Sequence, residues 1–368
     1  MNITIPPHLL PADARFGSGP TRVRADQVQA LAAANPRVLG TSHRQPPVKE
    51  LVGEVRSLLL ELFSAPDGYE VILGNGGASL FWDAATFHLI HRHAQFAESG
   101  EFGAKFAAAA RQAPWLEEPE VISGPPGTSA VPAASALIDT YAWVHNETST
   151  GVLNPVTRVE GAARGALMVV DGTSAAGGVD IDLAEVDAYY FSPQKAFGSE
   201  GGLWLSFVSP AAIARIEELA SRWTPASLSL SMALANSRQN QTLNTPSIST
   251  LLLIRSQLQW FAENGGLEFA AARSADSSRI LYSWAEESSY AAPWVAPAHR
   301  SPVVATIDFD DALDAGKITA ALRANGVVDV EPYRKLGRNQ IRVGTFPSVA
   351  PEDVRALIAC IEYVVERL

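Results

Sequence analysis

Lys195 and Asp171 are the residues of this chain whose type and setting most clearly suggest chemistry. Lys195 lies in a polar, glycine-rich loop (192–202) that follows a short apolar run at 188–191. Asp171 directly follows another apolar run, 167–170, which has the pattern of a buried strand. A lysine and an acid at neighbouring strand ends suit pyridoxal phosphate (PLP): the lysine forms a Schiff base and the acid pairs with the pyridinium nitrogen.

Other polar or aromatic residues at strand ends offer further contacts for such a cofactor. The segment 74–79 lies between a predicted strand and helix, where backbone N–H groups and the Ser79 hydroxyl can bind phosphate. Thr148 follows an apolar strand and can donate to a ring oxygen or phosphate, and Phe102 can stack on a planar ring. Taken singly, these segments are equally typical of tight turns and of a core aromatic.

Cationic residues recur in an otherwise acidic chain. Ser42-His43-Arg44 and Arg342 carry groups suited to carboxylate or phosphate, and arginine grips such anions with two hydrogen bonds. The segment 331–338 adds Arg334, Lys335 and Arg338. Each arginine alone is more readily explained as a surface charge, so only the group of cations as a whole suggests an anion-binding site.

Composition excludes several classes of protein. The 368 residues are 47% apolar and 18% charged, as in a globular enzyme. The net charge of −11 argues against nucleic-acid binding. Cys360 is the single cysteine, so no disulfide forms within the chain, and metal-binding motifs are absent from the sequence. No apolar stretch is long enough for a membrane span and no signal peptide is expected, so we predict a cytoplasmic protein.

Strand and helix patterns alternate along the first two thirds of the chain, which predicts a mostly parallel α/β sheet. Strands are expected at 70–73, 94–97, 120–122, 141–145, 167–170, 188–191 and 203–208, with helices at 47–63, 80–91, 103–113, 210–221 and 249–264. After Gly265-Gly266 the expected order is helix 267–287, strand 303–309, helix 314–325, strands 328–331 and 340–344, and helix 351–368. We therefore predict a large domain at 16–264 and a small α+β domain at 265–368, with residues 1–15 packing on the small one.

In combination these segments resemble the phosphoserine aminotransferases, which are class V, fold-type I PLP enzymes. The resemblance begins at about residue 16 and extends to the C-terminus. It is carried by Phe16-Gly-Ser-Gly-Pro-Thr21, Ser42-His-Arg44, Gly76-Gly-Ala-Ser79, Asn146-Glu-Thr148, Asp171-Gly-Thr-Ser174, Ser192-Pro-Gln-Lys195, Asn244-Thr-Pro246 and Ile341-Arg342. The Gln-Lys and Asn-Thr-Pro pieces, in this order, are the more specific ones.

The resemblance implies a role for each matching residue. Lys195 binds the cofactor and moves the α-proton, while Asp171 pairs with the pyridine nitrogen. The other implied cofactor contacts are Phe102 on the ring, Thr148 and Gln194 on its oxygens, Ala78 and Ser79 on its phosphate, and Asn244 and Thr245 from the partner subunit of a homodimer. Arg342 is implied to hold the substrate α-carboxylate, and His43 and Arg44 to hold the distal anion across the dimer interface.

Three positions depart from the best-known bacterial pattern. Ser79 stands where many members carry an arginine that contacts the substrate phosphate, and Phe102 replaces a tryptophan. Tyr333-Arg334 stands roughly where a His-Arg pair is usual. Arg44, Arg334, Lys335 and Arg338 are the cations that we consider as substitutes in the phosphate grip.

The predicted reaction is PLP-dependent transamination between glutamate and 3-phosphohydroxypyruvate, giving O-phospho-L-serine and 2-oxoglutarate in serine biosynthesis, with pyridoxine biosynthesis as a further possible role. The alternative that stays open is another class V aminotransferase, such as the alanine:glyoxylate type. A cysteine desulfurase is disfavoured because Cys360 lies in an apolar helical stretch. A non-catalytic phosphate-binding module would leave the Asp171, Gln194 and Lys195 set unexplained.

Overall fold

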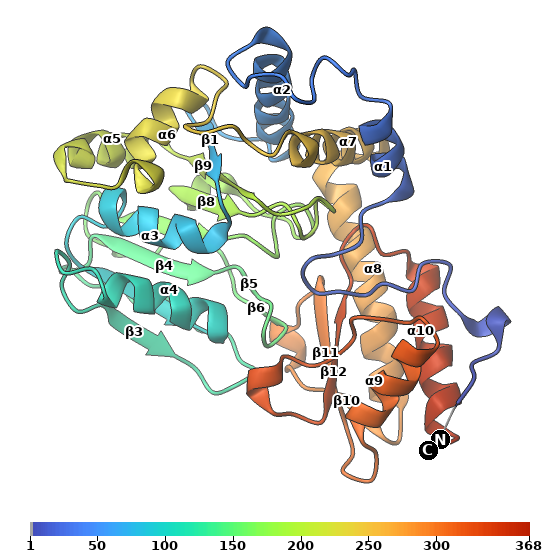
Figure 1. Ribbon diagram of the computed structural model, residues 1–368. Coiled ribbons are helices and arrows are strands. Elements are labelled where there is room, and N and C mark those ends of the chain that lie inside the picture. Colours follow the sequence, from blue (N-terminus) through green and yellow to red (C-terminus); the bar gives the residue numbers. More distant parts are fainter. Residues whose placement is uncertain (1–2) are drawn as a thin grey trace.

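The computed structural model describes residues 3–368, and its main feature is a seven-stranded sheet of order β1-β9-β8-β7-β4-β2-β3 (Figure 1). Its strands are β1 (Glu70–Asn75), β2 (Ala94–Glu98), β3 (Glu120–Ser123), β4 (Thr140–Val144), β7 (Leu167–Asp171), β8 (Ala188–Phe191) and β9 (Leu203–Val208). β9 runs antiparallel to β1 and β8, and the other neighbours pair in parallel. The predicted mostly parallel α/β class is confirmed.

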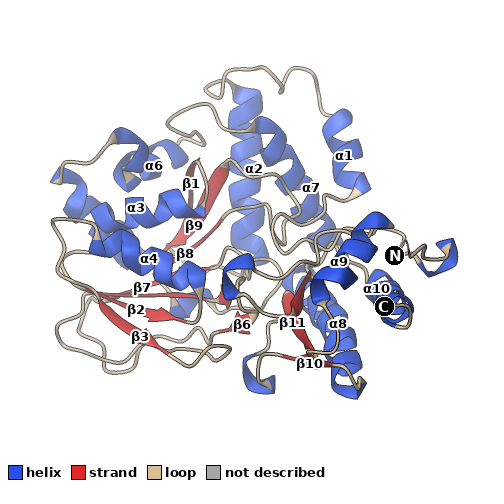
Figure 2. Ribbon diagram, turned by 60° about the horizontal axis from the view of Figure 1, so that its bottom comes forward, coloured by secondary structure: helices blue, strands red, loops and turns tan. Residues whose placement is uncertain are grey.

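Helices cover both faces of this sheet (Figures 1 and 2). They are α1 (Ala25–Ala32), α2 (Pro46–Leu62), α3 (Ala78–His88), α4 (Glu101–Arg111), α5 (Pro210–Glu218), α6 (Leu230–Ser237) and α7 (Ile248–Asn264). Adjacent strand residues enter opposite cores: Tyr189 packs in the core with α2 and α7, whereas Tyr190 stacks on Phe81 of α3 at 4.2 Å between ring centres. Burial on both faces explains why these strands are continuous apolar runs.

A smaller antiparallel sheet lies toward the C-terminus, with β10 (Ala291–Pro293), β11 (Val304–Phe309) and β12 (Gln340–Gly344). Its core is shared with α8 (Gly266–Glu287), α9 (Ala315–Ala324) and α10 (Pro351–Val365). Ile5 is buried in the same core, and Cys360 of α10 donates from Sγ to the carbonyl of Leu9 at 3.3 Å. Met1 and Asn2 of the predicted N-terminal segment lie outside the described residues. The division into two domains at 264/265 stays a prediction.

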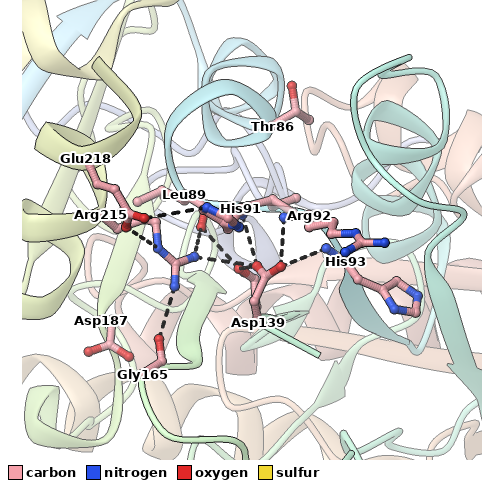
Figure 3. A network of polar contacts seen from close by, with 12 residues as sticks. Thr86, Leu89, His91, Arg92, His93, Asp139, Gly165, Asp187, Arg215 and Glu218 are labelled. Atoms are coloured by element: carbon pink, nitrogen blue, oxygen red, sulfur yellow. Dashed lines mark hydrogen bonds and ion pairs between the residues drawn. The ribbon is translucent and has the colours of Figure 1, made fainter. Parts of the chain in front are cut away.

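Asp139 organises the edge of the large sheet at which β2, β4 and β7 begin (Figure 3). Its carboxylate accepts the backbone N–H groups of His91, Arg92 and His93 at 2.7 to 2.9 Å. Arg215 of α5 donates to the carbonyl of Leu89 at 3.0 Å and lies 3.5 Å from the same carboxylate. These bonds fix the turn between α3 and β2 because they satisfy backbone groups that no helix or strand pairs.

The predicted strand at 328–331 is wrong. Val328 forms only an isolated parallel bridge with Arg15, and Asp329 has a φ of 66°. This left-handed conformation breaks an extended run. The remaining predicted elements are present with small shifts of their ends, and a two-stranded ribbon of β5 (Asn146–Glu147) and β6 (Val152–Leu153) adds to them. Within residues 3–368, no helix combines the length and the apolar character needed to cross a membrane.

Candidate active site

A cavity of about 580 Å³ opens at the carboxyl ends of the parallel strands. Asp171 is the last residue of β7, Lys195 lies in the loop after β8, and α4 begins three residues after β2. Carboxyl ends of neighbouring parallel strands meet at one edge of a sheet, which is where α/β proteins bind ligands. The predicted residues that line the cavity are Ala78, Ser79, Phe102, Thr148, Asp171, Gln194 and Lys195.

Lys195 is buried inside this cavity, with 7% of its surface exposed. Its ammonium donates to the carbonyl of Ser18 at 2.7 Å and to the hydroxyl of Thr148 at 3.4 Å. Burial lowers the pKa of Lys195 to about 7, and the charge of Arg342 acts in the same direction. The lysine is therefore poised to exchange a proton near neutral pH, as a general acid or base must.

The N-terminal loop closes over Lys195 at Gly19. This glycine has a φ of +148°, and a Cβ built on it would lie 2.2 Å from the lysine Nζ. Glycine is therefore required by both backbone conformation and space. Gly19 was not among the predicted site residues, although it lies in the Phe16–Thr21 segment that carries part of the resemblance.

Asp171 is a buried carboxylate with three donors around it. Its Oδ1 accepts the N–H of Thr173 at 2.8 Å, and its Oδ2 accepts Trp82 Nε1 at 3.2 Å and the Tyr190 hydroxyl at 3.1 Å. Burial raises the pKa of Asp171, and these hydrogen bonds oppose the rise. A positively charged ring nitrogen beside Asp171 would stabilise the ionised form.

The loop before α3 presents backbone N–H groups to the cavity. Gly77 is the N-cap of α3, so the first N–H groups of the helix, at Ala78 and Ser79, have no partner within the helix. Gly76 has a φ of +111°, and a Cβ there would lie 2.9 Å from Leu80 Cδ1, so the turn requires glycine. The N-terminus of this eleven-residue helix favours an anion such as a phosphate.

Several polar atoms around the cavity have no protein partner. Among the described residues, Gln194 Oε1, Asn146 Oδ1 and Arg342 Nε are buried without a hydrogen bond. An unpaired buried polar group is costly, so such atoms indicate a site that a polar ligand completes. Thr148 is held by a hydrogen bond of 2.9 Å from its hydroxyl to Ser174 Oγ.

Glu147 fixes the start of α4 and with it Phe102. The fully buried carboxylate accepts the N–H groups of Phe102 and Gly103 at 3.0 and 3.1 Å through Oε2. Its Oε1 accepts the N–H and the hydroxyl of Ser149 at 3.0 and 2.6 Å. Burial raises the pKa of Glu147. The carboxylate thereby replaces the missing helix partners at the N-terminus of α4.

Arg342 approaches the cavity from β12 of the smaller sheet. Its Nη1 donates to the carbonyl of Thr148 at 3.0 Å, and its guanidinium lies 5.3 Å from the ring centre of Tyr333. Burial lowers the pKa of Arg342, which nevertheless stays charged because arginine titrates far above neutral pH. Thr148 contacts both Arg342 and Lys195, so the guanidinium brings a positive charge near the lysine and contributes to its lowered pKa.

The remaining predicted residues do not line this cavity. His43 and Thr245 lie side by side, with Thr245 Oγ1 and His43 Nδ1 3.2 Å apart, and Asn244 borders a separate hollow beside Trp204. Arg44 and Arg334 are exposed. Within one chain, these residues are thus apart from Lys195, and their predicted part in a partner's site stays a prediction.

Sequence reasoning missed eight of the lining residues, which are Gly19, Gly77, Trp82, Lys105, Val144, Asn146, Thr173 and Ser174. Two of these eight lie within helices. Trp82 and Lys105 both face the cavity from the second turn of a helix, α3 and α4 respectively. Each lies three or four residues beyond a predicted site residue, Ala78 and Phe102. Residues at this spacing share one face of a helix, so this periodicity could have located both.

The residues present fit PLP. Lys195 supplies a reactive amine, Asp171 a carboxylate, Phe102 an aromatic wall, and the N-terminus of α3 a phosphate site. No group of three or more His, Cys, Asp or Glu residues suited to a metal occurs in the part of the chain that is described. The arrangement of Lys195 and Asp171 is that expected of an enzyme that binds a cofactor covalently.

Comparisons with known proteins agree with this geometry. Residues 135–329 match the family model described as aminotransferase class-V. The chain is 55% identical to a putative phosphoserine aminotransferase of Mycolicibacterium vanbaalenii, over 100% of this chain and 99% of that protein. It is 54% identical to a phosphoserine aminotransferase of Nocardioides sp., with the same coverage. The crystal structure of a phosphoserine aminotransferase from Cytophaga hutchinsonii shares the fold, with a TM-score of 0.87 at 22% identity, over 97% of this chain and 99% of that one.

The chain therefore belongs to the class V aminotransferases. Within that class, the relatives that share more than half of its residues over the full length are named phosphoserine aminotransferases. The resemblance seen in the sequence motifs is thus confirmed. The predicted fold type is confirmed as well, since the structural relatives are aminotransferases of the same architecture.

Proposed function

We propose that this chain is a PLP-dependent phosphoserine aminotransferase. It transfers an amino group between glutamate and 3-phosphohydroxypyruvate, giving O-phospho-L-serine and 2-oxoglutarate in serine biosynthesis. The observation that carries this proposal is a single cavity lined by both Lys195 and Asp171, in a chain whose full-length relatives bear that name. Action on 4-phosphohydroxythreonine in pyridoxine synthesis is a further proposal.

The cavity holds the cofactor through residues on several elements. PLP, when bound, supplies an electron sink for reactions at the α-carbon of an amino acid. Asp171 pairs with the ring nitrogen, Phe102 stacks on the ring, and Thr148 and Gln194 donate to its oxygens. Ala78 and Ser79 bind the phosphate at the N-terminus of α3.

Lys195 has two tasks in the proposed ping-pong reaction. It would anchor the cofactor through a Schiff base, and as a free amine it would be the base that takes the proton from the substrate α-carbon. The protonated amine would then be the acid that returns this proton. A pKa of about 7 suits both directions, since acid and base forms of the amine coexist at neutral pH.

The substrate is held by arginine at one end and by other cations at the opposite end. Arg342 is proposed to clamp the α-carboxylate with two hydrogen bonds, which its planar guanidinium favours. We further propose a cytoplasmic homodimer in which Asn244 and Thr245 complete the cofactor site of the partner, while His43 and Arg44 reach its substrate. These four residues do not line the cavity of their own chain, which supports this arrangement.

Absorbance spectroscopy tests the proposal. The visible band of the cofactor-loaded protein should disappear on titration with O-phospho-L-serine and return with 2-oxoglutarate, whereas alanine should leave it unchanged. Lys195→Ala should lose the band of covalently attached cofactor. A response to alanine alone would instead assign the chain to an alanine:glyoxylate type of enzyme, and the absence of any band after addition of PLP would contradict the cofactor assignment.

A further inference from the structure

Lys105 is a cation at the cavity that the proposed roles leave unused. It lines the same cavity as Ser79 and Phe102, and 44% of its side chain is exposed. Its ammonium lies 5.3 Å from the centre of the Phe102 ring, the expected ring partner of the cofactor. Ser79 is uncharged, although it stands where many members of the family carry an arginine. Lys105 therefore supplies a positive charge near that position.

Lys335 lies near the same region without lining the cavity itself. It lies in the 3₁₀ turn Arg334–Leu336, directly after Tyr333, whose ring centre is 6.2 Å from that of Phe102. Its ammonium forms an ion pair with Glu101 at the start of α4. This pair therefore joins the turn before β12 to the start of α4, next to the cavity-lining Phe102.

Glu101 holds both lysines with one oxygen. Its Oε1 pairs with Lys335 and lies 3.3 Å from Lys105 Nζ. The hydrogen bond from Lys335 lowers the pKa of Glu101, so the carboxylate is ionised at neutral pH. These pairs are partly exposed, and exposed ion pairs are weak enough to exchange partners.

The other cations of the loop are not comparably placed. Arg338 pairs with Asp308 and lies 4.5 Å from the ring centre of Trp294, which commits it elsewhere. Arg334 and Lys335 are both exposed, and neither lines the cavity itself, but Lys335 pairs with Glu101, the residue before the cavity-lining Phe102. Of the substitutes considered from the sequence, Lys335 is thus the one that the structure joins to the cavity wall.

Charge decides which ligand suits the two lysines. A phosphate monoester carries a charge of about −1.5 to −2 near pH 7 and three acceptor oxygens, whereas a carboxylate such as Glu101 carries −1. Two ammonium groups are therefore balanced better by a phosphate than by the carboxylate that holds them. Arg342 is buried more deeply than Lys105 and Lys335. A substrate that places its α-carboxylate at Arg342 would therefore direct its distal end outward, toward the two lysines.

We propose that Lys105 and Lys335 form the grip for the substrate phosphate, and that Glu101 is an exchangeable counter-ion which the phosphate displaces. This inference rests on the proposed function and deepens it, because it names the residues that select a phosphorylated substrate. It also makes Glu101 an internal competitor of the substrate.

The test compares phosphoserine with L-serine, which differs only in lacking the phosphate. Single-turnover conversion of the cofactor band gives kcat/KM for each amino acid in the cofactor-loaded protein, in Lys105→Gln, in Lys335→Gln and in the double variant. Each single change should lower kcat/KM for phosphoserine roughly twofold to fivefold, as for a partly exposed ion pair, and leave the value for L-serine unchanged. Lys317→Gln, which removes an exposed lysine of α9, is the matched control for net charge.

Further variants separate a grip from a structural contact. Lys105→Arg and Lys335→Arg should restore much of the preference for phosphoserine, and Glu101→Gln should lower KM for phosphoserine because the competing charge is gone. PLP affinity should be unchanged in all of them. Weakened PLP binding in Lys105→Gln would assign this lysine to the cofactor phosphate and overturn the inference.

The failure of this inference can be told from that of the proposed function. If the unaltered protein converts phosphoserine and the double variant does so with the same kcat/KM, the function stands and the lysine grip is wrong. Equal losses for phosphoserine and L-serine would show a structural contact only, which also overturns it. If the unaltered protein does not convert phosphoserine at all, the proposed function fails, and the inference with it.

Discussion

The pKa of Lys195 predicts how the uptake of PLP by the cofactor-free protein depends on pH. Burial, assisted by the charge of Arg342, lowers this pKa from 10.5 to about 7. Only the neutral amine attacks the cofactor aldehyde. At pH 7 about one half of Lys195 is then neutral, against about one in three thousand for an ordinary lysine, so the reactive fraction rises on the order of a thousandfold.

Stopped-flow absorbance after mixing the cofactor-free protein with PLP measures this reaction. The rate constant should rise about tenfold per pH unit below pH 7 and level off above pH 8, because the neutral fraction follows the titration of one amine. A simple alkylamine mixed with PLP is the control, since its rate should keep rising over the same range. The control also corrects for the titration of PLP itself.

Changing Arg342 tests the cause of the shift. Arg342→Met removes a like charge near Lys195, so the pKa of the lysine should rise and the break in the profile should move to higher pH. Arg342→Lys keeps the charge and should keep the break near its original position. A rate that rises without a break through pH 9 in the unaltered protein, or a break that moves to lower pH in Arg342→Met, would refute the reasoning.

Three further substitutions have expected outcomes. Gly19→Ala should abolish covalent PLP attachment, seen as loss of the visible band with the circular dichroism spectrum retained, because its Cβ would meet Lys195 Nζ. Glu147→Gln should cost about 2–4 kcal/mol in urea denaturation and weaken PLP binding, since an amide keeps one acceptor oxygen and its NH2 group must face the N–H groups of α4 or that of Ser149. Asp139→Ala should cost about 1–3 kcal/mol, read as a lower Tm, while activity per folded molecule is kept. An unchanged Tm for Asp139→Ala, with Asp276→Ala as the surface control, would show that this network contributes no stability.

The parts of the fold that were predictable are those with apolar periodicity. β9 and α2 were found because one is buried on both faces and the other has an apolar stripe. α1 was missed because Gln27 is its buried residue, so no apolar stripe marks it. The segment 328–331 was mistaken for a strand because its valines alternate, whereas the backbone turns at Asp329.

The chemistry of the site was predictable where it follows strand ends. Asp171 stands directly after one apolar run and Lys195 in the loop that follows another, so sheet topology predicts that the two lie near each other. The hydrogen bond from Trp82 to Asp171 could not be predicted, because it joins residues 89 positions apart through the packing of α3 on the sheet. The pairing of Lys335 with Glu101 depends likewise on how the smaller sheet meets the larger one.

The buried part of the site around Lys195 and the exposed part around Glu101 are held by different interactions. This difference suits the proposed reaction, which needs a fixed lysine and an entrance for the substrate. The turn after Lys195 is held by two fully buried amides: Gln27 donates to the carbonyls of Phe197 and Gly198 at 3.1 Å, and Gln257 donates to that of Ala196 at 3.2 Å. Buried bonds of this kind are costly to break, so the amine that moves the proton keeps its position. The part around Glu101 uses exposed ion pairs, which exchange at little cost, so a substrate can enter there without disturbing the lysine.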